Sequence, residues 1–228
     1  MKNLQLKSTL PAIALSLLTL AATGQAAVIT SNPSLPPVTG SYVSSPLTHL
    51  IFNDGGNTYD FSQFGTSGVS AFPNQTQGAD EIETFSLVMD QLLSINGGGA
   101  APLSEPGSAQ TKTFGKIGNV TGTFNAEMLQ LSLAGGTLPP GMMFRESPTL
   151  QSLGVTTITN IGGGLYRIDS YFDLFLQLTL DGGQNWIPEA SNVGKRIDLV
   201  PEPTGLSLLA AGLVGLLGFA RRHRAAVA

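Results

Sequence analysis

The sequence predicts an all-β domain, an antiparallel β-sandwich over residues 27–199, preceded by a signal peptide and followed by one C-terminal hydrophobic helix. Two observations predict this fold. Short runs rich in β-branched and aromatic residues alternate between apolar and polar side chains, and glycine-rich turns separate the runs. A series of short strands of this kind is typical of two packed antiparallel sheets.

Residues 1–26 have the layout of a secretory signal peptide. Lys2 and Lys7 are the only charges before an apolar run from Leu10 to Ala22, and Gly24-Gln25-Ala26 then supplies the small residues at which a signal peptidase cleaves. The apolar run is too short to span a bilayer comfortably. We therefore expect export of the remaining chain through the Sec machinery, followed by cleavage after this segment.

The composition of residues 27–199 excludes several kinds of chemistry. Six basic and fourteen acidic side chains give this part a net charge of −8, so it lacks the basic surface that collects phosphates, and nucleic acid is not expected as a partner. The chain contains no cysteine, which excludes disulfides, thiolate metal sites and cysteine nucleophiles. The domain must be stabilised by its own core.

The first part of the domain, residues 27–46, is rich in Ser, Thr, Pro and Val and predicts an extended segment with little regular structure. Farther along, Leu129, Leu131 and Leu133 are separated by polar residues. This period of two predicts a strand on which the three leucines share one face.

Three further segments are assigned from their patterns. Residues 155–169, with three consecutive glycines near the middle, predict a hairpin. Residues 165–180 alternate throughout and predict a half-buried strand, or two strands joined at a bend. Residues 82–95 fit a helical stripe and a strand equally well; because the surrounding pattern is β, we assign them to a strand.

One short motif has a recognisable turn chemistry. Thr179, Asp181, Gly183 and Trp186 fit the pattern Ser/Thr-x-Asp-x-Gly-x-x-Trp, which resembles the Asp-box of sialidases and related propellers. In that family the Asp side chain binds turn amides, and the motif lies away from the active site. The resemblance implies a structural hairpin here, since the motif occurs once and no arginine cluster accompanies it.

Catalytic machinery is not evident in the domain. His49 is its single histidine, and no Gly-x-Ser-x-Gly elbow accompanies it. Carboxylates remain as an alternative, because the run Asp80-Glu81-Ile82-Glu83 and the pair Asp169 and Asp173 contain the residue types that cleave glycosidic bonds. We predict no catalytic residues and no enzymatic activity.

One turn contains several oxygen ligands. Asp54, Asn57 and Asp60 flank two glycines in a loop that could hold Ca²⁺, although EF-hand spacing and a closing glutamate are missing. A plain turn is the favoured reading, and no other metal or cofactor is expected.

The C-terminal end has three parts in a fixed order. Residues 200–203 include Pro201, Glu202 and Pro203, and residues 204–220 are uncharged and apolar, at about 1.5 Å per residue just long enough to span a membrane as a helix. The cluster Arg221, Arg222 and Arg224 then favours a cytoplasmic end. This orientation agrees with export of the domain by the signal peptide.

These three parts at 200–228 resemble the sorting signal of PEP-CTERM proteins of Gram-negative bacteria. In that family an exosortase, a protease of the inner membrane, recognises and cleaves the tail. The resemblance implies an inner-membrane intermediate and then a cell-surface or extracellular-matrix location, with extracellular polysaccharide as a further candidate partner. We expect a non-enzymatic surface or matrix protein; the alternatives are a polysaccharide-acting enzyme and a permanently anchored single-pass protein.

Overall fold

The structure, a computed structural model, describes residues 27–37 and 39–201, and within these ranges all regular structure is β. The all-β expectation is confirmed for this part of the chain. In chain order the strands are β1 (Val28–Thr30), β2 (Gly40–Ser44), β3 (His49–Asp54), β4 (Asn57–Ala71), β5 (Gln75–Gln77), β6 (Asp80–Ile95), β7 (Ala101–Thr113), β8 (Gly122–Ala134), β9 (Met143–Glu146), β10 (Ser152–Gly162), β11 (Leu165–Leu174), β12 (Leu176–Thr179), β13 (Ile187–Pro188) and β14 (Lys195–Pro201).

Several sequence predictions concern other parts of the chain. The signal peptide (1–26), the membrane-spanning helix (204–220) and the sorting residues after Pro201 lie outside the described residues. Among the residues that are described, no helix has the length and hydropathy needed to cross a membrane.

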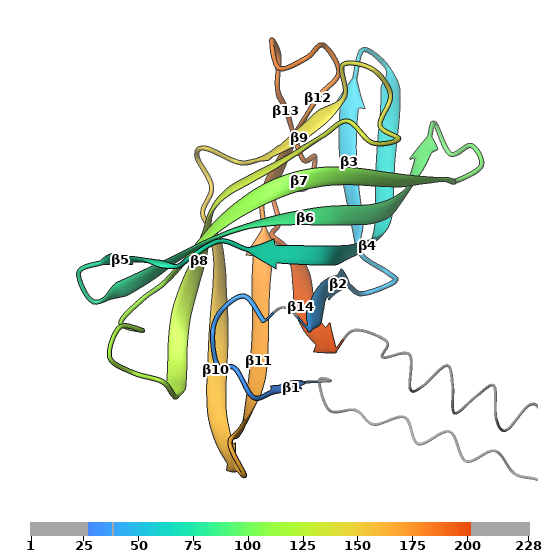
Figure 1. The fold of residues 1–228 in the computed structure, drawn as a ribbon. Coiled ribbons are helices and arrows are strands. Elements are labelled where there is room, and N and C mark those ends of the chain that lie inside the picture. The colour runs from blue at the N-terminus through green and yellow to red at the C-terminus, as the bar shows by residue number, and fades with distance from the viewer. Residues whose placement is uncertain (1–26, 38, 202–228) are drawn as a thin grey trace, which may run out of the picture.

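Eight strands form a closed antiparallel barrel (Figure 1). Around the ring the order is β11-β14-β2-β4-β6-β7-β8-β10, and β10 pairs with β11 to complete it. The predicted sandwich of two sheets is therefore not confirmed, because the pairing closes one sheet on itself. Three neighbouring strands, β6, β7 and β8, are long, with 16, 13 and 13 residues. Long strands can twist and coil, and this curvature lets the sheet close into a barrel.

The remaining strands extend the barrel at its ends. β9, β12 and β13 continue from β8, while β3 forms a hairpin with β4. In Figure 1 these strands gather at the top of the view, above the barrel. Phe52 of β3, Phe61 of β4 and Phe144 of β9 pack edge to face there, with the centroids of Phe61 and Phe144 4.8 Å apart. All three are almost fully buried, so they join this end to the barrel core.

Residues 27–46 contain more regular structure than expected. Val28 of β1 pairs with Ile168 of β11, and β2 pairs with β14 inside the ring. The serine- and proline-rich composition predicted an extended segment with little regular structure, but the long-range partners of these two strands supply their hydrogen bonds. Leu35 and Pro36, which are joined by a cis peptide, belong to the segment that connects β1 to β2. Both are buried, and they cover one end of the barrel interior.

The leucine alternation in β8 is interrupted. Gln130 pairs with Gln110, whereas Met128 pairs with Thr111, so Leu129 is an extra residue on the β8 side. Leu131 and Leu133 are buried as predicted, but Leu129 is 39% exposed, and that part of the prediction is wrong. The cause is the β-bulge, which reverses the alternation N-terminal to it.

The other strand assignments agree with the structure. Residues 82–95 lie within the strand β6, which settles the choice between helix and strand. β10 and β11 form the predicted hairpin, and residues 165–180 are two strands that meet at Phe175. Burial alternates along β11, where Ile168, Phe172 and Leu174 face the core.

The last strand reaches into the segment assigned to the tail. β14 pairs with β2 through Val200 opposite Ser41 and Pro201 opposite Gly40. Proline has no N–H to donate to a neighbouring strand. It is tolerated at this position because the strand ends there. Pro201 is thus both the end of the barrel strand and the first residue of the Pro-Glu-Pro sequence.

Candidate functional site

The Asp-box-like turn lies between β12 and β13. Asp181 Oδ1 accepts hydrogen bonds from the backbone N–H groups of Gln184 and Asn185, both at 2.9 Å, and from the Thr179 hydroxyl at 2.7 Å. These bonds, led by the one from the Asn185 backbone, lower the pKa of Asp181 to about 2. The Asp181 carboxylate therefore accepts hydrogen bonds from backbone N–H groups that have no carbonyl partner in the tight turn.

The glycines and the tryptophan of the motif complete this turn. Gly182 and Gly183 have φ values of +75° and +95°, which side-chain-bearing residues rarely adopt. The Trp186 indole N–H donates to the Gly183 carbonyl at 3.0 Å, and the Arg145 guanidinium lies 4.1 Å from the Trp186 ring centroid. The side-chain hydrogen bonds of Asp181 and Trp186 stay within the turn, while Arg145 of β9 and the Gly141 carbonyl, which accepts the Gly182 N–H at 2.8 Å, attach the turn to its neighbours. The structural role stays a prediction, tested by the Asp181 variant below.

The three candidate Ca²⁺ ligands are not gathered around one point. Asp54 and Asn57 are opposite each other at the tip of the β3–β4 hairpin. Asn57 Oδ1 accepts a hydrogen bond from the Asn96 amide at 2.9 Å, and Asp60 Oδ1 lies 2.7 Å from His49 Nδ1. No group of three or more acidic or histidine side chains that could hold a metal ion occurs among the described residues.

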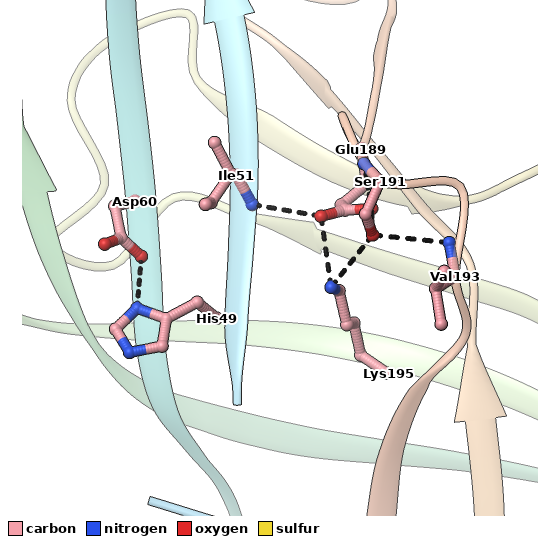
Figure 2. Close-up of polar contacts among 7 residues, drawn as sticks. All are labelled: His49, Ile51, Asp60, Glu189, Ser191, Val193 and Lys195. Atoms are coloured by element: carbon pink, nitrogen blue, oxygen red, sulfur yellow. Dashed lines mark hydrogen bonds and ion pairs between the residues drawn. The ribbon is translucent and has the colours of Figure 1, made fainter. Parts of the chain in front are cut away.

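His49 and Asp60 form a pair on neighbouring strands (Figure 2). A histidine–carboxylate pair supplies two of the three members of a nucleophilic triad, which also needs a hydroxyl on the other ring nitrogen. In the described part of the chain, the hydrogen bond to Asp60 is the one polar side-chain contact of His49. The pair therefore joins β3 to β4 without forming a triad.

A second polar cluster in Figure 2 surrounds the buried carboxylate of Glu189. Its Oε1 lies 3.3 Å from Lys195 Nζ and accepts the Ile51 N–H at 3.4 Å. Its Oε2 accepts the Ser191 hydroxyl at 2.6 Å and the Ser191 N–H at 2.9 Å. Sequence reasoning missed this cluster, because the loop after β13 and the start of β14 meet β3, which lies far away in the sequence.

The cluster contains a serine and a lysine in contact, which is the composition of a catalytic dyad. Lys195 Nζ lies 3.0 Å from Ser191 Oγ. The Ser191 hydroxyl, however, donates to Glu189 and accepts from Lys195, the reverse of the direction in which a lysine base would take the serine proton. The arrangement fixes the loop between β13 and β14 against β3 and does not prepare a nucleophile.

The acidic run at the start of β6 is divided between the two faces of the sheet. Asp80 lies 3.0 Å from Lys112 Nζ, and Glu81 lies 3.9 Å from Lys116 Nζ. Glu83 instead points into the barrel, where Oε2 accepts the Thr111 hydroxyl at 2.5 Å. Burial raises the pKa of Glu83 to about 7. Glu81, two residues away on the same strand, adds to this rise through its charge, while each of the two carboxylates has a partner of its own, Lys116 or Thr111.

A different pair of carboxylates shares one pocket. Glu127 of β8 and Glu146 of β9 both line a pocket of about 300 Å³ next to the start of β10. Burial raises the pKa of Glu146 to about 7, and the nearby charge of Glu127 adds to the rise. Ser152 donates to Glu146 at 3.2 Å, and Gln151 donates to Glu127 at 3.1 Å. The sequence holds no local signal for this pair, since 18 positions separate the two residues.

Of the predicted sorting residues, the structure describes Pro201 alone, which is exposed at the end of β14. Glu202, Pro203, Arg221, Arg222 and Arg224 lie outside the described residues. Comparison with known proteins found no matching family model, no similar curated protein and no similar solved structure.

Proposed function

We propose that this chain is an exported surface or extracellular-matrix protein whose C-terminal tail is recognised and removed by an exosortase-type protease. One observation carries the proposal: Pro201-Glu202-Pro203 is followed by the apolar residues 204–220 and then by an arginine cluster. The signal-peptide layout of residues 1–26 supports the same direction of export.

The position of Pro201 adds physical support. It is exposed and closes the last strand of the barrel, so Glu202 and Pro203 follow directly on a folded domain. Prolines on both sides of Glu202 restrict the backbone to extended conformations, which proteases bind. We therefore expect the motif to be read as an address and not to serve as part of a permanent anchor.

The intact mass and the cell fraction of the mature protein test this proposal. In a host with an exosortase, the mature protein should lack residues 221–228 and leave the inner-membrane fraction. Changing Pro201, Glu202 and Pro203 together to alanine should leave a full-length form in that membrane. A matched control changes the exposed loop residues Pro139 and Pro140 to alanine and should be processed normally.

The alternative of a permanent single-pass anchor gives the opposite result. The unmodified protein would then keep residues 221–228 and remain in the inner membrane, and the alanine variant would behave like it. The simple anchor would also be independent of the exosortase, so deleting that protease would change neither the mass nor the cell fraction.

A second candidate function is cleavage of a polysaccharide by Glu127 and Glu146. The observation that favours it is their shared pocket together with the raised pKa of Glu146, since a glycosidase needs one protonated and one ionised carboxyl. Release of reducing ends from polysaccharides tests it. Activity should disappear in Glu146→Gln and persist in Glu81→Gln; no activity, or equal activity in both variants, would exclude this candidate.

A further inference from the structure

A groove of about 560 Å³ lies on the outer face of the barrel. β10 forms its middle, between β8 and β11, and Leu153 and Val155 form an apolar floor with Gly154 between them. Phe114 and Tyr171 also line it. None of the clusters described above occupies this surface.

Strand register places the two aromatic residues on opposite sides of the floor. Asn125 lies opposite Val155, and Val155 lies opposite Tyr171, so these three form one row across three strands, about 10 Å long. Phe114 follows β7 and donates its backbone N–H to the Asn125 carbonyl at 2.9 Å, beyond the β8 end of that row. A flat ligand on the floor would thus have an aromatic ring at each end.

A lysine holds the ring at the β7 side. Lys112 Nζ lies 4.9 Å from the Phe114 ring centroid. The same ammonium lies 3.0 Å from a carboxylate oxygen of Asp80 and donates to the Gln77 side chain at 2.9 Å. The cation therefore fixes the ring, while its charge is already compensated.

An arginine has the same role at the β11 side. The Arg196 guanidinium carbon lies 3.5 Å from the Tyr171 ring centroid. Arg196 Nε lies 3.2 Å from a carboxylate oxygen of Asp198. Here too the aromatic ring is held in position by a cation that an acidic neighbour neutralises.

Two polar side chains in the groove retain unused hydrogen-bonding capacity. The Asn125 amide and the Asp173 carboxylate both line the groove. Neither side chain makes a hydrogen bond or ion pair with any other described residue. Asn125 is exposed and Asp173 is partly buried, so both can exchange water for the hydroxyls of a ligand that lies on the shared apolar floor. Asp173 is also the one charged residue among those that line the groove, with Arg196 as its cross-strand neighbour on β14, and its charge would disfavour an anionic ligand there.

We propose that this groove binds a neutral polysaccharide. The apolar face of a sugar ring would pack on the floor and against Phe114 and Tyr171, while its hydroxyls would bond to Asn125 and Asp173. A sugar has this combination of one apolar face and a polar rim, and a neutral sugar avoids repulsion by Asp173. The inference deepens the proposed function and rests on it for its biological setting, a surface or matrix rich in polysaccharide.

Titration calorimetry of the full chain in mild detergent tests the site, with cellohexaose and maltohexaose as neutral probes and hexagalacturonate as the acidic probe. A neutral probe should bind saturably and at least about tenfold more tightly than the acidic one. Phe114→Ala and Asp173→Asn should each weaken neutral binding about tenfold. Asp173→Asn should also reduce the discrimination against hexagalacturonate.

Two matched controls lie outside the groove. Phe72→Ala removes another exposed phenylalanine, and Asp169→Asn neutralises an ion-paired aspartate on the same strand, β11. Both should bind the neutral probe as the unmodified chain does. Absence of saturable neutral binding, tighter binding of hexagalacturonate, or equal losses in test and control variants would overturn the inference. These results are independent of tail processing, so failure here leaves the export proposal intact, and the reverse also holds.

Discussion

The carboxylate of Glu189 lies 3.3 Å from the ammonium of Lys195, and this ion pair joins the loop after β13 to the first residue of β14. The other bonds of Glu189 go to the Ile51 backbone of β3 and to both polar groups of Ser191. One buried side chain therefore connects an edge hairpin, a loop and a strand of the barrel ring.

Replacing Glu189 by alanine should lower the free energy of unfolding by about 2–3 kcal/mol, because three donors and one cation lose their acceptor together. Urea denaturation at neutral pH measures this change. Asp54→Ala is a suitable control, since Asp54 is exposed at a hairpin tip, and it should be nearly neutral. Equal effects of the two substitutions would show that the Glu189 cluster does not contribute to stability.

Asp181→Ala should lower the thermal unfolding midpoint by a few degrees, because the Gln184 and Asn185 amides lose their acceptor. The low pKa of Asp181 sets the sign of a pH effect. The contribution of its carboxylate is present above about pH 4 and is lost as the pH falls toward 2. The thermal unfolding midpoints of the unmodified chain and of Asp181→Ala should therefore differ at pH 7 and coincide at pH 2.

The same variant separates structure from function in the turn. Polysaccharide binding by the folded fraction of Asp181→Ala should equal that of the unmodified chain. An unchanged midpoint together with lost binding would instead assign the motif to a binding role.

Strand positions could be predicted from the sequence because alternation is a local property. Phe172 and Leu174 are separated by one polar residue and both face the core. Closure of the barrel could not be predicted, because a strand of a sandwich and a strand of a barrel alternate alike. Closure depends instead on distant pairings, such as Tyr171 of β11 with Asp198 of β14 and Val155 of β10 with Asn125 of β8.

The same distinction applies to the candidate sites. The contacts of Asp181 lie within four residues, so the motif could be read from sequence. The contact of Glu189 with Ile51 and the pocket of Glu127 and Glu146 depend instead on tertiary contacts for which the sequence gives no sign. Leu129 was misassigned because one inserted residue reverses the pattern of two.

The carboxyls inside the barrel should make stability fall as the pH rises. Burial raises the pKa values of Glu83 and Glu105 to about 7, from ordinary values of 4.5. Between these two pH values the folded state keeps protons that the unfolded state releases, so their contribution is full below about pH 4.5 and lost as the pH rises through about 7. Each carboxyl accounts for roughly 3 kcal/mol of that loss.

Glu83→Gln tests this pH dependence directly. The variant should be less stable than the unmodified chain by no more than about 1 kcal/mol at pH 4.5, since an amide can still accept from Thr111, and relatively more stable at pH 8. Urea denaturation across this range measures the difference. Asp54→Asn, which removes an exposed carboxyl at the tip of the β3–β4 hairpin, should leave the dependence of the unfolding free energy on pH unchanged. If the unfolding free energy of Glu83→Gln changed with pH as steeply as that of the unmodified chain, the Glu83 pKa would lie near its ordinary value.

Residues 27–201 should fold without either end of the chain. The closed ring and its core lie within this range, and the lack of cysteine makes folding independent of reductant. Ending the fragment at 199 should cost about 1 kcal/mol, because β14 then loses the pairings of Val200 with Ser41 and Pro201 with Gly40. Circular dichroism should show β structure in both fragments, with a lower urea midpoint for the shorter one. A helical or disordered spectrum of the 27–201 fragment would contradict the barrel, and equal midpoints would mean that the strand ends at Leu199.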